Sequence, residues 1–177
     1  MTLKLKQSKR INMKFIYTTL LLLITLYGYS QNIIIGDSQT PYIDLHSQKI
    51  EKLVGLWKGG ISVPKLIKMV QNYRISPEIK NVVICIGTND GYVDLGVEKL
   101  INSIYRTFPN SKMYIVQGSW GWGGVRRITP DKVKNYYQKY KFLGVTVIKT
   151  PIGKREPHRD CPTYKKIGEE IDVLLYL

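Results

Sequence analysis

With 177 residues, of which 44% are hydrophobic and 23% charged, the chain is long enough for one domain with a real core and too ordinary in composition to be disordered throughout. Its 27 basic and 13 acidic residues give a formal charge of +14, which favours anionic partners. The basic residues are scattered, however, and no aromatic-basic recognition motif is present, so we predict no nucleic-acid partner.

The first thirty residues have the pattern of a signal peptide. A basic stretch from Lys4 to Lys14 contains no acid, the apolar run FIYTTLLLLITLYG follows at 15–28, and small residues precede a cut near Gln31. Met13 is an alternative start that leaves a more compact signal. The apolar run is shorter than the roughly 20 residues that a transmembrane helix needs.

We therefore expect the protein to be secreted or periplasmic, with no stable membrane insertion after cleavage. An uncleaved N-terminal membrane anchor is the alternative. Removal of residues 1–30 leaves 22 basic and 13 acidic residues, a formal charge of +9. Residues 31–177 contain no repeat and no Pro/Gly linker, so they are predicted to form a single domain.

Apolar runs alternate with helical patterns along this domain. Ser62 precedes a helix with an early proline, and Thr129 precedes another, as N-cap residues do. The run NVVICIG is continuously apolar, which is typical of a strand buried on both faces. Strands are predicted at 32–35, 81–87, 112–118 and 144–150, helices at 63–73, 97–108, 131–142 and 163–177, and a weak helix or irregular segment at 41–53.

Strands that alternate with helices at this spacing predict right-handed βαβ units and a parallel sheet covered on both faces. The expected fold class is α/β, three-layer α/β/α and doubly wound. In such sheets ligands bind beyond the carboxyl ends of the strands, and this rule selects the loops that carry chemistry.

Three of those loops hold residues suited to acyl transfer. Ser38 follows the first strand, Asn89 follows the strand at 81–87, and His158 lies after the last strand. A serine can act as nucleophile, a histidine can take its proton, and an asparagine amide can donate to a developing oxyanion. We therefore expect these three side chains to meet at one edge of the sheet.

At these residues the sequence resembles the SGNH (GDSL-type) hydrolases. Gly36-Asp37-Ser38 matches their first block and Gly87-Thr88-Asn89-Asp90 their third, while KGGISVPKL resembles the second, with Gly60 better aligned than Gly59. The resemblance implies a flavodoxin-like sheet, a nucleophilic Ser38, and no metal or cofactor. It also implies an oxyanion hole formed by the N–H groups of Ser38 and Gly60 and by the Asn89 side chain, with Asp37 and Asp90 bracing the loops.

The last block of the family, Asp-x-x-His with a Tyr six residues later, is only partly matched. Aligning Tyr164 puts His158 at the histidine position and Arg155 where the aspartate belongs. A second register, anchored on a Pro directly after the His, puts Cys161 at the histidine position instead. His158 is the better candidate for the base, and a solvated loop histidine is the alternative.

The acid that orients His158 is left open between two residues. Glu156 and Asp160 are both candidates, and a backbone carbonyl is a third solution. Asp160 also stands where a helix N-cap is expected, just before Pro162. A Ser-His pair with a weak acid or none can still work, although more slowly.

The glycine-rich segment QGSWGWGGVRR (117–127) follows a strand and should lie on the same rim. Trp120 and Trp122 are candidate substrate contacts that stack on sugars or acyl groups, and the alternative is that a Trp covers the core. Arg126 and Arg127 either meet an anionic group or are solvated.

These features predict an exported serine esterase whose partner is an acylated small molecule or a glycan, and which acts on O-acyl, chiefly acetyl, groups of carbohydrate. The alternative is a catalytically inactive carbohydrate-binding module that keeps the SGNH fold. A phosphate-binding flavodoxin-like protein is disfavoured because neither G-x-G-x-x-G nor G-x-x-x-x-G-K-[ST] is present. Cys85 is expected to be a buried free thiol rather than half of a disulfide with Cys161, and two isolated histidines make a zinc site improbable.

Overall fold

The computed structural model of the protein describes residues 31–123, 127–150 and 158–176. These belong to one unit of the chain, Gln31–Leu177. The predicted signal peptide, residues 1–30, lies outside the described residues.

Five parallel strands form a single sheet in the order β2-β1-β3-β4-β5. This order is that of a flavodoxin-like, doubly wound sheet, as the sequence predicted. The strands are β1 (Asn32–Gly36), β2 (Glu51–Trp57), β3 (Asn81–Cys85), β4 (Lys112–Val116) and β5 (Thr146–Ile148).

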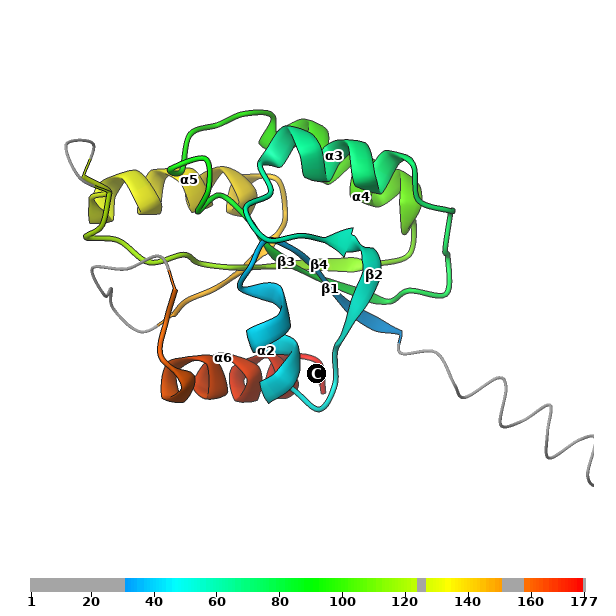
Figure 1. The fold of residues 1–177 in the computed structure, drawn as a ribbon. Coiled ribbons are helices and arrows are strands. Elements are labelled where there is room, and N and C mark those ends of the chain that lie inside the picture. The colour runs from blue at the N-terminus through cyan, green and yellow to red at the C-terminus, as the bar shows by residue number, and fades with distance from the viewer. Residues whose placement is uncertain (1–30, 124–126, 151–157, 177) are drawn as a thin grey trace, which may run out of the picture. The chain divides into compact units, whose positions relative to one another are not determined.

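Helices cover both faces of the sheet, which gives the three layers (Figure 1). The helices α3, α4 and α5 lie on one face, and α2 and α6 lie on the other. Their bounds are α2 (Thr40–His46), α3 (Val63–Gln71), α4 (Val97–Thr107), α5 (Pro130–Phe142) and α6 (Cys161–Leu174).

Each face of the sheet has its own apolar core. The larger core joins Ile35 and Ile84 to α3, α4 and α5, and the smaller joins Ile34 and Val83 to Ile43 of α2 and to α6. Because neighbouring residues of a strand point to opposite faces, the unbroken runs NIII and NVVIC supply both cores at once. These runs were recognisable as buried strands for this reason.

The segment at 41–53 differs from the prediction. Residues 40–46 form the regular helix α2, and a strand, β2, then begins at Glu51. This strand is at the edge of the sheet, its pairing with β1 is irregular between Lys52 and Trp57, and Val54 is 85% exposed. An irregular edge strand has neither a continuous apolar run nor a clean alternation, so its sequence does not announce it.

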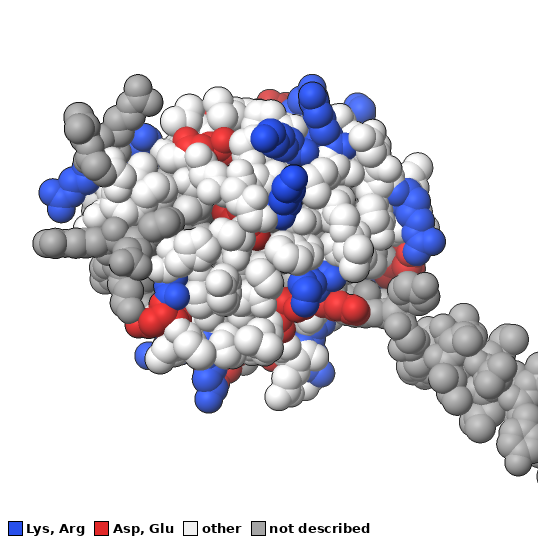
Figure 2. Space-filling model, in the orientation of Figure 1, with Lys and Arg blue, Asp and Glu red and all other residues white. Residues whose placement is uncertain are grey.

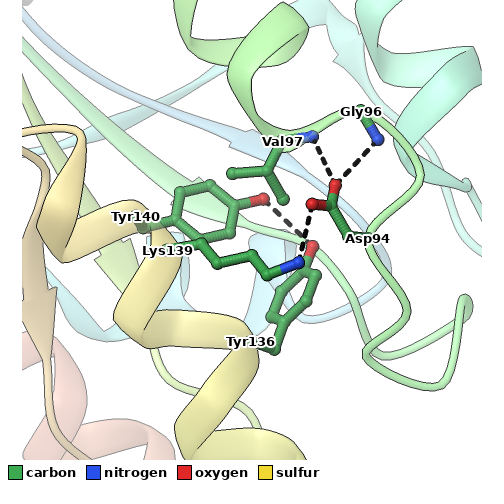
Figure 3. A network of polar contacts seen from close by, with 6 residues as sticks. All are labelled: Asp94, Gly96, Val97, Tyr136, Lys139 and Tyr140. Carbon is green, nitrogen blue, oxygen red and sulfur yellow. Dashed lines mark hydrogen bonds and ion pairs between the residues drawn. The ribbon is translucent and has the colours of Figure 1, made fainter.

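A polar network joins the start of α4 to α5 (Figure 3). Asp94 accepts hydrogen bonds from the Gly96 and Val97 N–H groups, each at 3.0 Å, and from Lys139 Nζ at 2.8 Å. Beside it, the Tyr136 and Tyr140 hydroxyls lie 3.0 Å apart. The bond from Lys139 and the two backbone N–H groups lower the pKa of Asp94 to about 2.

The variant Asp94→Asn tests this network through the pH dependence of stability. A carboxyl whose pKa is lower in the folded state stabilises the fold above its unfolded pKa of about 4, and this contribution is lost as the pH falls toward 2. The side chain is 40% exposed, so we expect a difference of about 1 kcal/mol or less at pH 6. Urea unfolding of both proteins at pH 6 and pH 2.5 should show the difference shrinking at the lower pH; a constant difference would contradict it.

Charged side chains are spread over the visible face of the domain, with Asp and Glu among Lys and Arg (Figure 2). This distribution agrees with the scattered lysines of the sequence. Within the described ranges, none of the helices is long and apolar enough to cross a membrane.

Candidate active site

The carboxyl end of β1 presents Ser38 on a tight turn. At Gly36, where φ is +131°, an added Cβ would lie 1.9 Å from the Cys85 carbonyl oxygen, so only glycine allows β1 to run this close to β3. The chain then turns, with the Thr40 N–H donating to the Asp37 carbonyl at 3.1 Å. Ser38 is half-buried at this turn, immediately before α2.

His158 reaches Ser38 from the opposite end of the chain. Its Nε2 atom lies 3.1 Å from Ser38 Oγ, which is hydrogen-bonding distance. The imidazole also packs edge-on against the Tyr42 ring of α2, with ring centroids 5.9 Å apart, and Tyr42 stacks on Tyr164 of α6 at 5.2 Å. The Tyr42 ring, itself stacked on Tyr164, therefore flanks the imidazole that faces the serine.

The two glycines after β2 form the next part of the rim. The Lys58 N–H donates to the Gly36 carbonyl at 2.9 Å, which holds this loop against the end of β1. An added Cβ on Gly59 would lie 4.0 Å from Ser38 Cβ, so Gly59 faces the serine. Gly60 has φ +69°, a conformation that favours glycine. Both glycines thus belong to the loop beside Ser38.

Asn89 and Asp90 lie on the loop after β3. Asn89 Nδ2 donates to the Ile61 carbonyl at 3.0 Å, and the amide keeps a second N–H for another acceptor. Asp90 Oδ2 accepts from the Val63 N–H at 2.8 Å, at the first residue of α3. The loop at 87–90 therefore braces the loop that carries Gly59 and Gly60, and Asn89 lies next to that loop.

Backbone donors are available at this edge. Among the described residues, the N–H groups of Ser38, Gly59 and Gly60 donate no hydrogen bond. Free N–H groups beside a nucleophile are what an oxyanion hole requires. A hydroxyl, an imidazole and backbone donors therefore lie on neighbouring loops at this edge of the sheet.

Asp37 is fully buried beneath Ser38. Its Oδ1 accepts from the Gln39 N–H at 3.0 Å, whereas Oδ2 has no hydrogen-bond partner in the described part of the chain. Burial raises the pKa of Asp37 to about 7, against the lowering effects of the Gln39 N–H and the Arg159 charge. Its buried position and its bond to Gln39 fit the bracing role that the resemblance implies.

Neither a protein-family model nor a curated protein matches the chain, whereas several solved structures do. A member of the lipolytic protein G-D-S-L family from Veillonella parvula is 15% identical, with 82% of this chain and 98% of that chain covered at a TM-score of 0.55. The lipase/acylhydrolase from Enterococcus faecalis is 13% identical, with 81% of this chain and 94% of that chain covered at a TM-score of 0.56. A carbohydrate esterase family 2 enzyme with a carbohydrate binding domain, from Corynascus thermopiles, is 16% identical. The match covers 81% of this chain and 64% of that chain at a TM-score of 0.58.

The chain has the SGNH hydrolase fold. The sheet order and the similarity to G-D-S-L structures agree with the resemblance of the sequence blocks. In this fold Ser38 and Asn89 lie on loops at the carboxyl ends of β1 and β3, and His158 reaches Ser38 from the segment before α6. Because these structures are less than 20% identical to the chain, they support the fold and do not indicate a substrate.

Of the two candidates for the orienting acid, the structure describes one, Asp160. Asp160 is the N-cap of α6 and accepts from the Thr163 N–H at 3.1 Å. This is the capping role that the sequence offered as the alternative. Glu156 and Arg155 lie outside the described residues.

Trp120 and Trp122 are half-buried and pack against the larger core. Trp122 Nε1 donates to the Ser119 carbonyl at 3.1 Å, and its ring lies edge-on to Tyr92 at 6.1 Å. The two indoles thus lie over the α3–α5 side of the SGNH sheet, and each keeps part of its surface exposed. Arg126 lies outside the described residues, and Arg127 is exposed.

The two cysteines are both free: Cys85 is buried and Cys161 is exposed. Cys161 Sγ lies 3.4 Å from Nε2 of His46, which is the last residue of α2. Within residues 31–123, 127–150 and 158–176, no three His, Cys, Asp or Glu side chains are grouped as metal ligands.

Sequence reasoning missed one residue of this site, Arg159. Its side chain is only 9% exposed, directly after His158. In the sequence it stands in REPHRDCP, a run of charged and polar residues that is typical of a solvated loop. No local pattern distinguishes it, because its partners come from distant parts of the chain.

Proposed function

We propose that the protein is an exported serine esterase that removes O-acyl groups, chiefly acetyl, from carbohydrate. The observation that carries the proposal is the 3.1 Å distance between Ser38 Oγ and His158 Nε2, in a fold shared with lipolytic and esterase structures. That distance lies within the range expected between a nucleophile and its base.

In the first half of the reaction, His158 Nε2 takes the proton from Ser38 Oγ as the oxygen attacks the ester carbonyl carbon. The carbonyl oxygen becomes an oxyanion, which accepts hydrogen bonds from the N–H groups of Ser38 and Gly60 and from the Asn89 amide. The C–O bond to the sugar then breaks, and His158 returns its proton to the sugar oxygen. Ser38 is left acylated.

In the second half, water attacks the acyl carbon of Ser38. His158 accepts a proton from the water, the same donors hold the second oxyanion, and the proton returns to Ser38 Oγ as the free acid leaves. Neither step needs a metal or a cofactor. This mechanism assigns roles to Ser38, His158, Asn89 and Gly60. Gly59 is the glycine that faces Ser38.

Support for a carbohydrate substrate comes from three sources. Solved structures of similar fold include a carbohydrate esterase family 2 enzyme. The half-buried indoles of Trp120 and Trp122 offer aromatic surface to a sugar ring. Export, which the residues before Gln31 predict, would bring the enzyme to extracellular or periplasmic glycans.

The second candidate is an inactive carbohydrate-binding module with the same fold. It is favoured by one observation, the arginine at position 155 where the family pattern has an aspartate. A module of this kind would keep affinity for glycan without covalent chemistry at Ser38.

Labelling with a fluorophosphonate probe separates the two candidates. An activated Ser38 should be phosphonylated, and mass spectrometry of peptides should locate the adduct on Ser38 alone. Acetate release from acetylated xylan and from 4-nitrophenyl acetate should follow in the same preparation. Glycan binding without labelling or acetate release would replace the esterase by the binding module.

A further inference from the structure

The side chain of Arg159 is buried and reaches Gln39, the residue after Ser38. Arg159 follows His158 directly, and its backbone N–H donates to the Tyr164 hydroxyl at 3.2 Å. Burying a guanidinium costs free energy unless its donors are satisfied. Its partners therefore indicate what the residue does.

Those partners join several loops. Arg159 Nη1 donates to Gln39 Oε1 at 2.7 Å, and Nη2 donates to the Gln117 carbonyl at 2.6 Å and to Thr150 Oγ1 at 2.9 Å. Gln39 is the residue after Ser38, Gln117 follows β4, and Thr150 follows β5. One side chain thus ties the His158 segment to the ends of three strands.

The network continues to the loop that carries Asn89. Gln39 Nε2 donates to Thr88 Oγ1 at 2.9 Å, so the Gln39 amide accepts from Arg159 and donates to Thr88. Gln39 and Thr88 are 4% and 7% exposed, which means that water does not compete for these bonds. The three loops that hold Ser38, Asn89 and His158 are linked through one continuous chain of hydrogen bonds.

We propose that Arg159 is the positioning residue of this site, which holds the His158 imidazole at Ser38 by tying its segment to Gln39. This proposal rests on the esterase proposed above. In the family pattern, an acid three residues before the histidine would orient the imidazole; here that position is Arg155. The tether from Arg159 places the histidine through its backbone, and the Tyr42 ring flanks the imidazole at 5.9 Å.

An arginine suits this task because its planar fork fixes several acceptors in different directions at once. A lysine has a compact ammonium on a flexible stem and cannot reproduce the fork. Replacement by methionine removes all three side-chain bonds and leaves the side-chain oxygen Oε1 of Gln39 without its donor. Since misplacement by about 1 Å costs on the order of 100-fold in rate, the effect should appear in the chemical step.

The test compares Arg159→Met and Arg159→Lys with Arg106→Met, a matched change at an exposed arginine in the last turn of α4. Hydrolysis of 4-nitrophenyl acetate is measured at a temperature where thermal unfolding shows each variant to be folded. For Arg159→Met we expect kcat to fall roughly 10- to 100-fold with KM changed less than about 3-fold, and for Arg159→Lys an intermediate loss. Arg106→Met should match the wild type. An unchanged kcat in folded Arg159→Met overturns the proposal.

A purely structural role is distinguished by combining the change with His158→Ala. If Arg159 acts through His158, Arg159→Met should slow fluorophosphonate labelling of Ser38 in the wild type and have no further effect on the His158→Ala protein. An equal loss in both backgrounds overturns the proposal. Should Arg159→Met fail to fold, Gln39→Met removes the bond to Arg159 Nη1 and carries the same expectation.

The proposal can also be judged if the esterase proposal fails. A wild-type protein without hydrolysis or labelling removes the esterase but leaves the tether to be measured by NMR of the His158 imidazole. The imidazole signals should shift or broaden in Arg159→Met and stay unchanged in Arg106→Met. Unchanged signals in Arg159→Met overturn the positioning role, whatever the activity.

Discussion

Replacing Ser38 by alanine is expected to lower the hydrolysis of 4-nitrophenyl acetate by at least about 10³-fold, because no other hydroxyl of the described residues faces His158 Nε2. The protein should stay folded. Ser38 is half-buried, and among the described residues its hydroxyl makes one hydrogen bond, to an exposed histidine, so its loss should cost less than about 1 kcal/mol. Initial rates and urea unfolding curves of both proteins measure the two effects.

The matched control is Ser62→Ala. Ser62 is also half-buried and lies on a neighbouring loop, as the N-cap of α3, and its side chain makes no capping hydrogen bond. This variant should keep wild-type turnover and wild-type labelling. Undiminished turnover in Ser38→Ala would end the assignment of Ser38 as nucleophile, and a parallel loss in both variants would point to the loop rather than to the hydroxyl.

Much of the fold could be predicted because the buried strands have simple sequences. NIII and NVVIC serve two cores at once and therefore read as unbroken apolar runs. Helices α5 and α6 begin where Thr129 and Asp160 each accept a hydrogen bond from a backbone N–H. These signals are local, so they are present in the sequence before any tertiary contact forms.

The part of the fold that escaped prediction depends on tertiary contacts. Strand β2 is an edge strand with an irregular register, and Gly55 inside it has φ +86°. Its pairing with β1 comes from the neighbouring backbone rather than from its own side chains. The sequence from 41 to 53 therefore looked like a weak helix or an irregular segment.

The candidate site, like the fold, contains residues with a local sequence signal and residues that only tertiary contacts reveal. Ser38 and Asn89 directly follow buried strands, so sequence alone placed them at one edge of the sheet. Arg159 could not be found in this way, since its bond to Gln39 spans 120 positions. Trp122 likewise meets Tyr92 from another loop, so the sequence left open whether a Trp covers the core or contacts substrate.

The buried carboxyl of Asp37, beside the nucleophile, should make the stability of the fold depend strongly on pH. The pKa of Asp37 is raised to about 7, first by burial, whereas an aspartate in the unfolded chain has a pKa near 4. Between about pH 4 and pH 7 the folded state holds a proton that the unfolded state has released. Stability from this group is therefore complete below about pH 4 and is lost as the pH rises through about 7.

The variant Asp37→Asn isolates this contribution, because asparagine cannot ionise and keeps an oxygen for the Gln39 N–H. Three pH units correspond to about 4 kcal/mol, so the wild type should lose stability relative to the variant by up to that amount between pH 4.5 and pH 8. Urea unfolding across this range measures the trend. Asp94→Asn is the control: its group titrates near pH 2, so its difference from the wild type should stay constant from pH 5 to 8. Parallel curves for Asp37→Asn and the wild type would show that Asp37 is ionised throughout, with the Arg159 charge outweighing the effect of burial.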